Sequence, residues 1–221
     1  MLFDDKSLFE KTGDSFEAGA VIFSEGEPGT EMYLIKSGRV KVIRSEKSGT
    51  KVLSILGAGS LFGEMALIEA KPRSATVMAM EKTEVLVLTF NDLERIISGK
   101  PEFLFRLIQV LCKRIRFTTC QVRNFSIKST PGRTADLLLM LADSCNYDPE
   151  KTDRIKLGIG ALEISQMTGV EKEAIDSTLR EFQSNGLIAI EGTDSLSITN
   201  LDGLKSTRHF ILRKENFNDN L

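Results

Sequence analysis

The sequence predicts an α+β chain. An N-terminal β-roll of the double-stranded β-helix, or jelly-roll-like, type is followed by a long helix and a C-terminal winged helix-turn-helix domain. Short runs rich in Val, Ile and Leu alternate with glycine-bearing turns between Phe16 and Phe90, and an apolar heptad pattern begins near Pro101. Two short helical patterns joined by a tight turn then precede a hairpin pattern. We therefore expect two domains, 1–128 and 129–221.

The N-terminal part is predicted to form antiparallel β structure because its apolar runs are short and are separated by turn residues. Turns are expected at Glu25–Gly29, Ser37–Gly38 and Gly57–Gly59, where glycine tolerates the backbone angles of tight turns. Many short strands with tight turns are typical of a small barrel or roll. The expected strands are 21–23, 31–36, 39–45, 51–56, 75–79 and 83–89.

One long helix is predicted over 101–128. Pro101 suits a helix start, because the backbone N–H that proline lacks would have no partner in the first turn. Apolar positions then recur at alternating spacings of four and three, the pattern of a coiled-coil seam, so we expect a homodimer through this helix. The seam residues are Leu104, Ile108, Leu111, Ile115, Thr118, Val122 and Phe125.

The second domain follows a predicted hinge at Ser129–Gly132, where a proline and a glycine interrupt the helical pattern. Gly169–Val170 is expected to be the turn of a helix-turn-helix, and Gly186 its C-terminal cap. From about Lys205 the sequence is polar and uncapped, and we expect it to be frayed. The expected helices are 133–145, 161–169 and 171–186, and the expected wing strands are 187–191 and 195–199.

Composition indicates an ordinary soluble globular protein, with 41% apolar residues, 27% charged residues and a net charge of −2. Residues Met1–Glu10 lack the basic and apolar regions of a secretory signal. No apolar stretch approaches the roughly 20 residues that a membrane span needs. We therefore expect a cytoplasmic protein with no membrane partner.

Catalytic and metal chemistry have little support in the sequence. Cys112, Cys120 and Cys145 are an odd number at spacings that suit neither a disulfide framework nor a cluster of four thiolates. His209 is the one histidine, and no phosphate-binding P-loop or nucleophile–base pair is evident. We therefore expect reduced thiols, no metal, no catalytic residues and no enzyme activity.

The segment Leu61–Val77 is the most informative part of the chain. A cyclic phosphate carries one negative charge, and a partly dry pocket must supply a fixed cation and several N–H donors to bind it. Arg73 can supply the cation, and Gly63 allows the backbone to approach a ligand. A short helix beginning near Glu64 would direct N–H groups at the phosphate. The Glu64 carboxylate is then free to accept a hydrogen bond from a ribose hydroxyl, and the Ser74 hydroxyl is a further donor to the phosphate. A Glu and an Arg at this spacing can also be ordinary solvated surface residues.

Over about fifteen positions, this segment resembles the phosphate-binding cassette of cyclic-nucleotide-binding domains. Phe62-Gly63-Glu64, Ala66-Leu67 and Arg73-Ser74-Ala75 match the pattern of that cassette. The resemblance implies cAMP or cGMP as an allosteric ligand, and a hydroxyl after the cassette Arg, as at Ser74, can contact guanine in relatives that bind cGMP. The predicted ligand-binding residues are Leu53, Gly63, Glu64, Met65, Ala66, Arg73, Ser74, Ala75, Thr118 and Thr119.

The long helix carries a second resemblance. Lys113–Thr119, continuing to Gly132-Arg133, is similar to the dimer helix and hinge of the bacterial catabolite-activator/FNR (CRP/FNR) family of transcription regulators. In its cAMP-responsive members a Thr-Ser pair contacts the adenine amino group, one hydroxyl from each subunit, and Thr118 and Thr119 match that pair. A polar seam residue such as Thr118 can instead fix helix register. Members that bind an iron–sulfur cluster or haem need ligands that this chain does not offer.

The helix-turn-helix pattern keeps the apolar framework of that family but not its exposed face. Where the recognition helices commonly present Ser-Arg-Glu and a later Arg, this chain has Glu171, Lys172, Glu173 and Ser177. Residues 131–221 carry ten Lys and Arg against fifteen Asp and Glu, a net charge of −5, which opposes phosphate binding. We still expect duplex DNA as a partner, and the candidate DNA-binding residues are Lys172, Glu173, Ser177 and Arg180.

Together these features predict a homodimeric transcription regulator gated by a cyclic nucleotide, with cAMP the leading candidate. The ligand would favour one arrangement of the hinge at Ser129–Gly132. The alternative is a cyclic-nucleotide sensor whose degenerate winged helix contacts protein rather than DNA. The two hypotheses differ in whether the chain binds duplex DNA with a steep dependence on salt.

Overall fold

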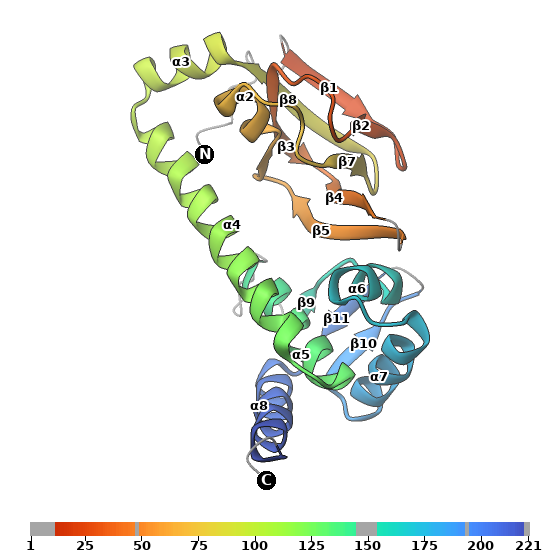
Figure 1. Cartoon of the computed structure of the whole chain (residues 1–221). Helices are drawn as coiled ribbons and strands as arrows, with labels where there is room; N and C mark the ends of the chain where they lie inside the picture. Colours follow the sequence, from red (N-terminus) through yellow and green to blue (C-terminus); the bar gives the residue numbers. More distant parts are fainter. Residues whose placement is uncertain (1–11, 47–48, 145–153, 193–194, 219–221) are drawn as a thin grey trace. The chain divides into compact units, whose positions relative to one another are not determined.

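The computed structural model describes residues 12–46, 49–144, 154–192 and 195–218 (Figure 1). The chain divides into two compact units, Met1–Arg114 and Ile115–Leu221, and the boundary falls within the long helix α4, Glu102–Ser126. Antiparallel sheets build the first unit, and the second contains the helix-turn-helix and its wing, which confirms the predicted fold class. None of the helices in these ranges is both long and apolar enough to cross a membrane.

Two four-stranded antiparallel sheets form the β-roll, in the orders β1-β8-β3-β6 and β2-β7-β4-β5. All six predicted strands are present with ends within two residues of the prediction, whereas the short strands β1 and β6 were not predicted. The bounds are β1 Gly13–Phe16, β2 Val21–Phe23, β3 Glu31–Ser37, β4 Arg39–Glu46, β5 Gly49–Gly57, β6 Leu61–Phe62, β7 Thr76–Ala79 and β8 Thr83–Thr89.

Strand β3 connects the core of the roll to helix α4, because side chains on both of its faces are buried. Tyr33 and Ile35 belong to a hydrophobic cluster shared with β2, β4 and β7. Met32 and Leu34 point to the other face, as alternation along a strand requires, and pack in a second cluster with Phe103 of α4. Helix α4 therefore packs directly on the sheet β1-β8-β3-β6, whose strand β6 begins the cassette.

Helix α3, Phe90–Gly99, is an element that the apolar pattern did not predict. Its start is a capping box: the Thr89 hydroxyl accepts from the Asp92 N–H at 3.3 Å, and the Asp92 carboxylate accepts from the Thr89 N–H at 3.1 Å. Hydrogen bonds from Thr89, above all from its hydroxyl, lower the pKa of Asp92. The Thr-x-x-Asp spacing was thus a local signal for this helix.

The second unit contains the predicted helix-turn-helix and wing. Gly169, with a left-handed φ of 69°, ends the first helix, and Gly186 with φ 68° follows the second, as expected. A two-residue strand, β9, adds a third strand to the wing, in the order β10-β11-β9. The bounds are α5 Thr130–Ser144, β9 Ile155–Lys156, α6 Ala161–Thr168, α7 Lys172–Ser184, β10 Ile188–Ile190, β11 Leu196–Ile198 and α8 Leu201–Asn218.

Two predictions for this unit are corrected. Helix α5 begins at Thr130, so Pro131 and Gly132 of the predicted hinge lie inside its first turn, where proline is tolerated. The break between α4 and α5 is only 127–129. The predicted end of this helix at Cys145 lies outside the described residues.

The prediction of an uncapped, frayed segment from Lys205 is wrong, because this segment belongs to α8. Asn200 caps the helix start by accepting the Gly203 N–H at 2.8 Å. Leu204 is fully buried, and Arg208 forms an ion pair with Asp136 of α5 at 2.6 Å. Tertiary contacts with α5, rather than an amphipathic pattern, therefore stabilise this polar helix.

Candidate functional site

The cassette, defined here as Leu61–Val77, has the predicted order of turn, short helix, loop and strand. Strand β6 leads into Gly63, whose left-handed φ of 77° turns the chain into α2, Glu64–Glu69. A side chain at Gly63 would also meet the Arg73 Nη1 atom at 2.7 Å, so glycine is needed for both backbone and space. The loop after α2 then carries Arg73 to strand β7.

Arg73 lies inside the protein with only 5% of its surface exposed. Its Nη1 atom donates to the Glu31 carbonyl at 2.8 Å and to the Gly63 carbonyl at 2.9 Å. Its Cζ atom lies 4.1 Å from the centre of the Phe23 ring, close enough for cation–π attraction. Contacts from β2, β3 and the cassette thus fix the orientation of the guanidinium.

The other edge of this guanidinium is unpaired. The Arg73 Nε atom is buried and has no hydrogen-bond partner. Within the described ranges, no carboxylate forms an ion pair with Arg73. A buried charge without a counter-ion is costly, and an anion at the Nε edge would both neutralise it and receive its N–H bond. The geometry is that of an anion-binding position.

An aromatic cluster of Phe23, Tyr33 and Phe62 lies beside Arg73. Tyr33 stacks on Phe62 with ring centres 4.9 Å apart, and Phe23 lies 5.8 Å from Tyr33. The Tyr33 hydroxyl donates to the Glu31 carboxylate at 3.0 Å. Burial, together with this hydrogen bond, raises the pKa of Tyr33 to about 12. Tyr33 therefore stays protonated and neutral beside the arginine at physiological pH.

Glu64 is 3% exposed and forms an ion pair with Arg114 of α4, a residue that was not among the predicted site residues. Arg114 also donates from Nη2 to the Leu61 carbonyl at 2.7 Å. The Oε1 atom of Glu64 therefore already has a partner within the protein. No local signal could have identified this pair, since its members lie fifty residues apart in the sequence.

The other predicted cassette residues fall into two groups. Ala66 and Ala75 are buried, as expected for small residues packed around a buried arginine. Met65 and Ser74 are exposed, and the Ser74 hydroxyl donates weakly to the Met65 sulfur at 3.7 Å. Leu53 is half-buried at an irregularity in the pairing of β4 and β5.

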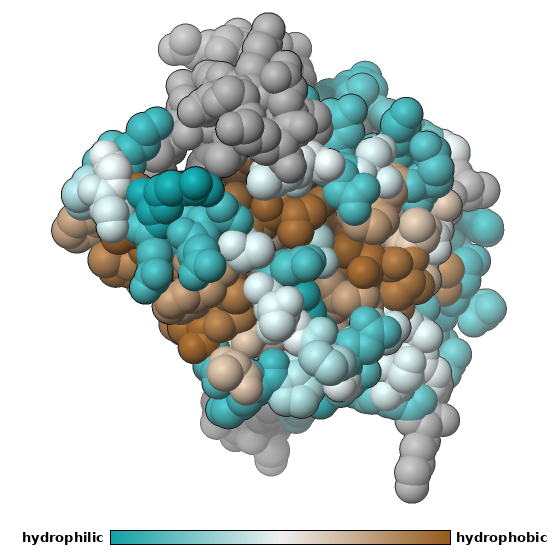
Figure 2. Space-filling view, turned by 90° about the horizontal axis from the view of Figure 1, so that it is seen from above, coloured by the Kyte–Doolittle hydropathy of each residue, from teal (hydrophilic) through white to brown (hydrophobic). Residues whose placement is uncertain are grey.

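Thr118 and Thr119 both lie exposed on α4, in the second compact unit. Thr118 belongs to the predicted seam, in which Ile115 and Val122 are each 67% exposed. The Thr119 hydroxyl donates to the Ile115 carbonyl at 2.9 Å, one turn back along its own helix. Figure 2 shows apolar side chains at the surface among polar ones. The large apolar side chains that are exposed on α4 are Leu104, Phe105, Ile108, Ile115, Val122 and Phe125.

The recognition helix α7 buries Ile175, Leu179 and Phe182 and exposes the face with the candidate DNA-binding residues. Its first exposed cation is already paired, because Lys172 donates to Asp176 at 2.9 Å. This hydrogen bond raises the pKa of Lys172. The other candidates on the exposed surface are Glu173, Ser177 and Arg180.

A buried carboxylate joins the end of α4 to α5 and α8. Asp136 is 1% exposed and forms ion pairs with Arg123 at 2.9 Å and with Arg208 at 2.6 Å. It also accepts from the Asn124 amide at 3.2 Å. This cluster fixes α8 within the second unit, and the sequence patterns did not predict it.

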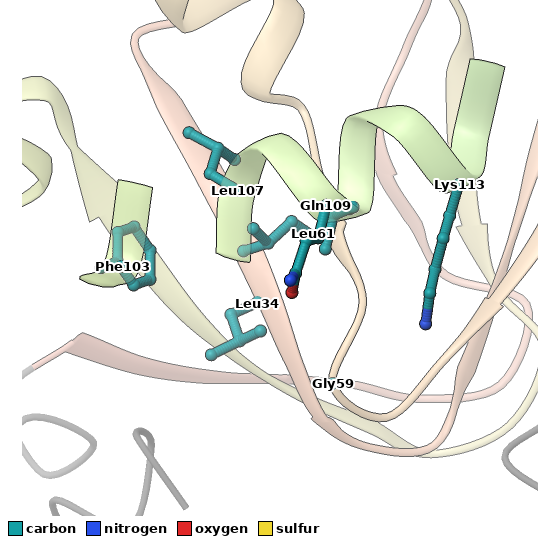
Figure 3. A pocket seen from close by; sticks show the side chains of 8 residues that line it. Leu34, Gly59, Leu61, Phe103, Leu107, Gln109 and Lys113 are labelled. Carbon is teal, nitrogen blue, oxygen red and sulfur yellow. The ribbon is translucent and has the colours of Figure 1, made fainter. Parts of the chain in front are cut away.

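A cavity of about 160 Å³ lies between α4 and strands β3 and β6 (Figure 3). Leu34, Leu61, Phe103 and Leu107 form its apolar wall, and Gln109 and Lys113 extend beside it from α4. None of the predicted ligand-binding residues lines it, so this cavity is separate from the Arg73 site. Within the described part of the chain, no three His, Cys, Asp or Glu side chains are grouped to hold a metal ion.

Two stretches of the chain match known domain families. Residues 14–100 match the cyclic nucleotide-binding domain, and residues 132–207 match the Crp-like helix-turn-helix domain. A CRP-like cAMP-activated global transcriptional regulator of Mycobacterium tuberculosis is 30% identical over 182 residues, covering 82% of this chain and 81% of the relative. The cAMP-activated global transcriptional regulator CRP of Haemophilus influenzae is 30% identical over 182 residues, 80% of each protein.

Solved structures share this fold at lower identity. A CooA variant from Carboxydothermus hydrogenoformans superposes with a TM-score of 0.74 at 21% identity, over 93% of this chain and 91% of that one. FixK2 from Bradyrhizobium japonicum gives a TM-score of 0.73 at 18% identity, over 89% and 96% of the two chains. With its two domains in this order, the chain belongs to the CRP/FNR family of transcription regulators, as the cassette and the long helix predicted.

Proposed function

We propose that this chain is a transcription regulator whose DNA binding is controlled by cAMP. The observation that supports this proposal most strongly is the buried Arg73 guanidinium with its unpaired Nε atom. A cyclic phosphate diester suits this position, because one arginine neutralises its single charge. Relatives named as cAMP-activated regulators favour cAMP over other cyclic nucleotides.

Glu64 and Ser74 complete the proposed site around the phosphate. A carboxylate accepts several hydrogen bonds, so Glu64 can accept from a ribose hydroxyl while it keeps its ion pair with Arg114. The exposed Ser74 hydroxyl follows Arg73 in the chain and can donate to the phosphate. The same hydroxyl makes cGMP the alternative ligand. The remaining proposed contacts of the ligand are Leu53, Gly63, Met65, Ala66 and Ala75.

We propose a homodimer formed through α4. Its exposed apolar stripe follows the spacing of a coiled-coil seam, and pairing two stripes would remove Ile115 and Val122 from water. Thr118 lies in this stripe, so pairing would bring the threonines of two chains together. By their match to the family's Thr-Ser pair, Thr118 and Thr119 are the proposed contacts of the adenine amino group.

The winged helix is proposed to bind duplex DNA through Lys172, Glu173, Ser177 and Arg180 of α7. The exposed pair between Lys172 and Asp176 is weak, so phosphate contacts can replace it at little cost. That pair and the net charge of −5 over residues 131–221 also favour a second candidate function. In this second candidate the chain senses a cyclic nucleotide and its winged helix contacts a protein.

Calorimetric titration tests the ligand proposal. We expect cAMP to bind wild type more tightly than cGMP does, and Arg73→Ala to weaken cAMP binding by at least about 30-fold, because a buried charge pair is worth about 2–5 kcal/mol. Arg95→Ala is the matched control, since Arg95 is a highly exposed arginine of α3. No binding of either nucleotide to wild type would reject the proposal.

Fluorescence anisotropy with a random-sequence duplex pool tests the DNA proposal. We expect binding that strengthens with cAMP and weakens steeply as salt rises, because cations on the protein replace counter-ions on DNA. Ligand shifts the DNA-binding state only by its different affinity for the two states. If the cAMP-bound protein does not bind duplex DNA even at low salt, the alternative in which the winged helix contacts a protein is favoured.

A further inference from the structure

The loop 24–30 between β2 and β3 holds the backbone of Arg73. The Gly26 N–H donates to the Arg73 carbonyl at 2.9 Å, and the Arg73 N–H donates to the Glu27 carbonyl at 2.8 Å. These reciprocal bonds fix the loop directly against the arginine, although Gly29 and Arg73 lie forty-four positions apart in the sequence. The position of this loop therefore bears on where the guanidinium can lie.

Gly26 and Gly29 differ in what a side chain would meet at each position. Gly26 has a left-handed φ of 85°, and a side chain there would meet open space. Gly29 has an ordinary φ, but a Cβ atom there would lie 2.5 Å from Arg73 Nε, 2.6 Å from Arg73 Cζ and 2.8 Å from the Ala66 Cβ. Space, rather than backbone conformation, thus explains the glycine at position 29.

Three residues, Phe23, Gly29 and Gly63, closely surround the Arg73 guanidinium. The centre of the Phe23 ring lies 4.1 Å from Cζ, and a Cβ atom on Gly63 would lie 2.7 Å from Nη1. Gly29 lies against Nε and Cζ. Van der Waals contact between such atoms needs about 3.5 Å, so a methyl group at position 29 would push the guanidinium or Ala66 aside by about 1 Å. Gly29 therefore lies next to the Arg73 Nε atom, which is buried and has no hydrogen-bond partner.

We infer that Gly29 is a positioning residue for the anion bound by Arg73, an assignment that rests on the proposed function. It acts through Arg73: the absent side chain lets the guanidinium lie where its Nε edge faces the ligand. A charge-assisted hydrogen bond is about 2.7–2.9 Å long and weakens quickly when stretched by 1 Å. Gly29→Ala is therefore expected to weaken cAMP binding by about 10- to 100-fold.

Calorimetric titration of cAMP into wild type, Gly29→Ala and Gly57→Ala tests this inference. Gly57 is the matched control, because it also has an ordinary φ and the nearest atom to its Cβ position is 3.7 Å away, an ordinary contact. We expect Gly57→Ala to bind within about twofold of wild type. Wild-type affinity in Gly29→Ala would overturn the role of Gly29 alone, whereas a wild type that binds no cyclic nucleotide would overturn the proposed function as well.

A ligand-free measurement separates positioning from a general packing defect. Urea unfolding is compared for wild type, Gly29→Ala, Arg73→Ala and the double variant. Because the methyl group collides mainly with the guanidinium, Gly29→Ala should lower the unfolding midpoint in wild type and lower it by about half as much or less once Arg73 is alanine. An equal loss in both backgrounds would show that the loop, not the arginine, excludes the side chain.

Discussion

Replacing Arg114 with alanine should destabilise the protein far more than the loss of a surface ion pair does. Glu64 is 3% exposed, and Arg114 provides its ion pair and also donates to the Leu61 carbonyl at 2.7 Å. After the substitution the buried carboxylate would lack its cation, and Leu61 would lose a donor. Both changes affect the turn into α2, where the cassette begins.

The magnitude follows from the burial of the two partners. Removing one partner of a buried pair costs about 3–5 kcal/mol. The Arg114 side chain is 32% exposed, so solvent reduces this cost, and we expect about 2–3 kcal/mol. Adding Glu64→Gln to Arg114→Ala should restore at least about half of the loss, because a neutral amide is less costly to bury than a charge.

Urea unfolding of wild type, the two single variants and the double variant measures the coupling between Arg114 and Glu64. Arg95→Ala is the control, since its ion pair with Asp92 is exposed on the Arg95 side, and its cost should stay within about 1 kcal/mol. If Arg114→Ala costs no more than Arg95→Ala, Arg114 does not hold Glu64 in the way the contacts indicate.

Three further predictions concern other parts of the chain. Ile115→Glu should convert the proposed dimer to a monomer in sedimentation, because a charge would enter the proposed α4 seam; an unchanged mass would reject α4 as the interface. The raised pKa of Tyr33 means that its protonated form stabilises the fold fully below about pH 10, and that this stabilisation is lost as pH rises through about 12. Tyr33→Phe should therefore flatten the decline of the unfolding midpoint between about pH 10 and pH 12. An equally steep decline in that variant would assign it to other groups. Arg208→Ala should speed amide exchange across α8, since Asp136 would lose its contact from that helix, and unchanged exchange would contradict the role of this ion pair.

Local patterns predicted much of the fold. The six strands, the helix-turn-helix and the wing follow from periodicity and turn residues, which act within a few positions along the chain. Gly63, Gly169 and Gly186 have the left-handed backbone expected of turns and caps. The cassette motif likewise predicted that a buried arginine would follow a short helix, since its residues are contiguous.

The features that the sequence patterns did not predict depend on contacts between residues far apart in the sequence. Helix α8 is polar and shows no amphipathic pattern, yet Leu204 and the ion pair of Arg208 with Asp136 hold it on α5. Arg114 lies within a long helical pattern and gives no local sign of its pair with Glu64. Gly29 resembles any turn glycine until the fold places Arg73 against it. Such contacts depend on tertiary structure, which periodicity does not encode.

A crystal structure of the protein grown with cAMP would test the role of Arg73 most directly. We expect a phosphate oxygen at about 2.7–2.9 Å from the Arg73 Nε atom, which is buried and has no hydrogen-bond partner within the protein. A cAMP molecule bound elsewhere, with that nitrogen still unpaired, would contradict the assignment of the cassette as the receptor site.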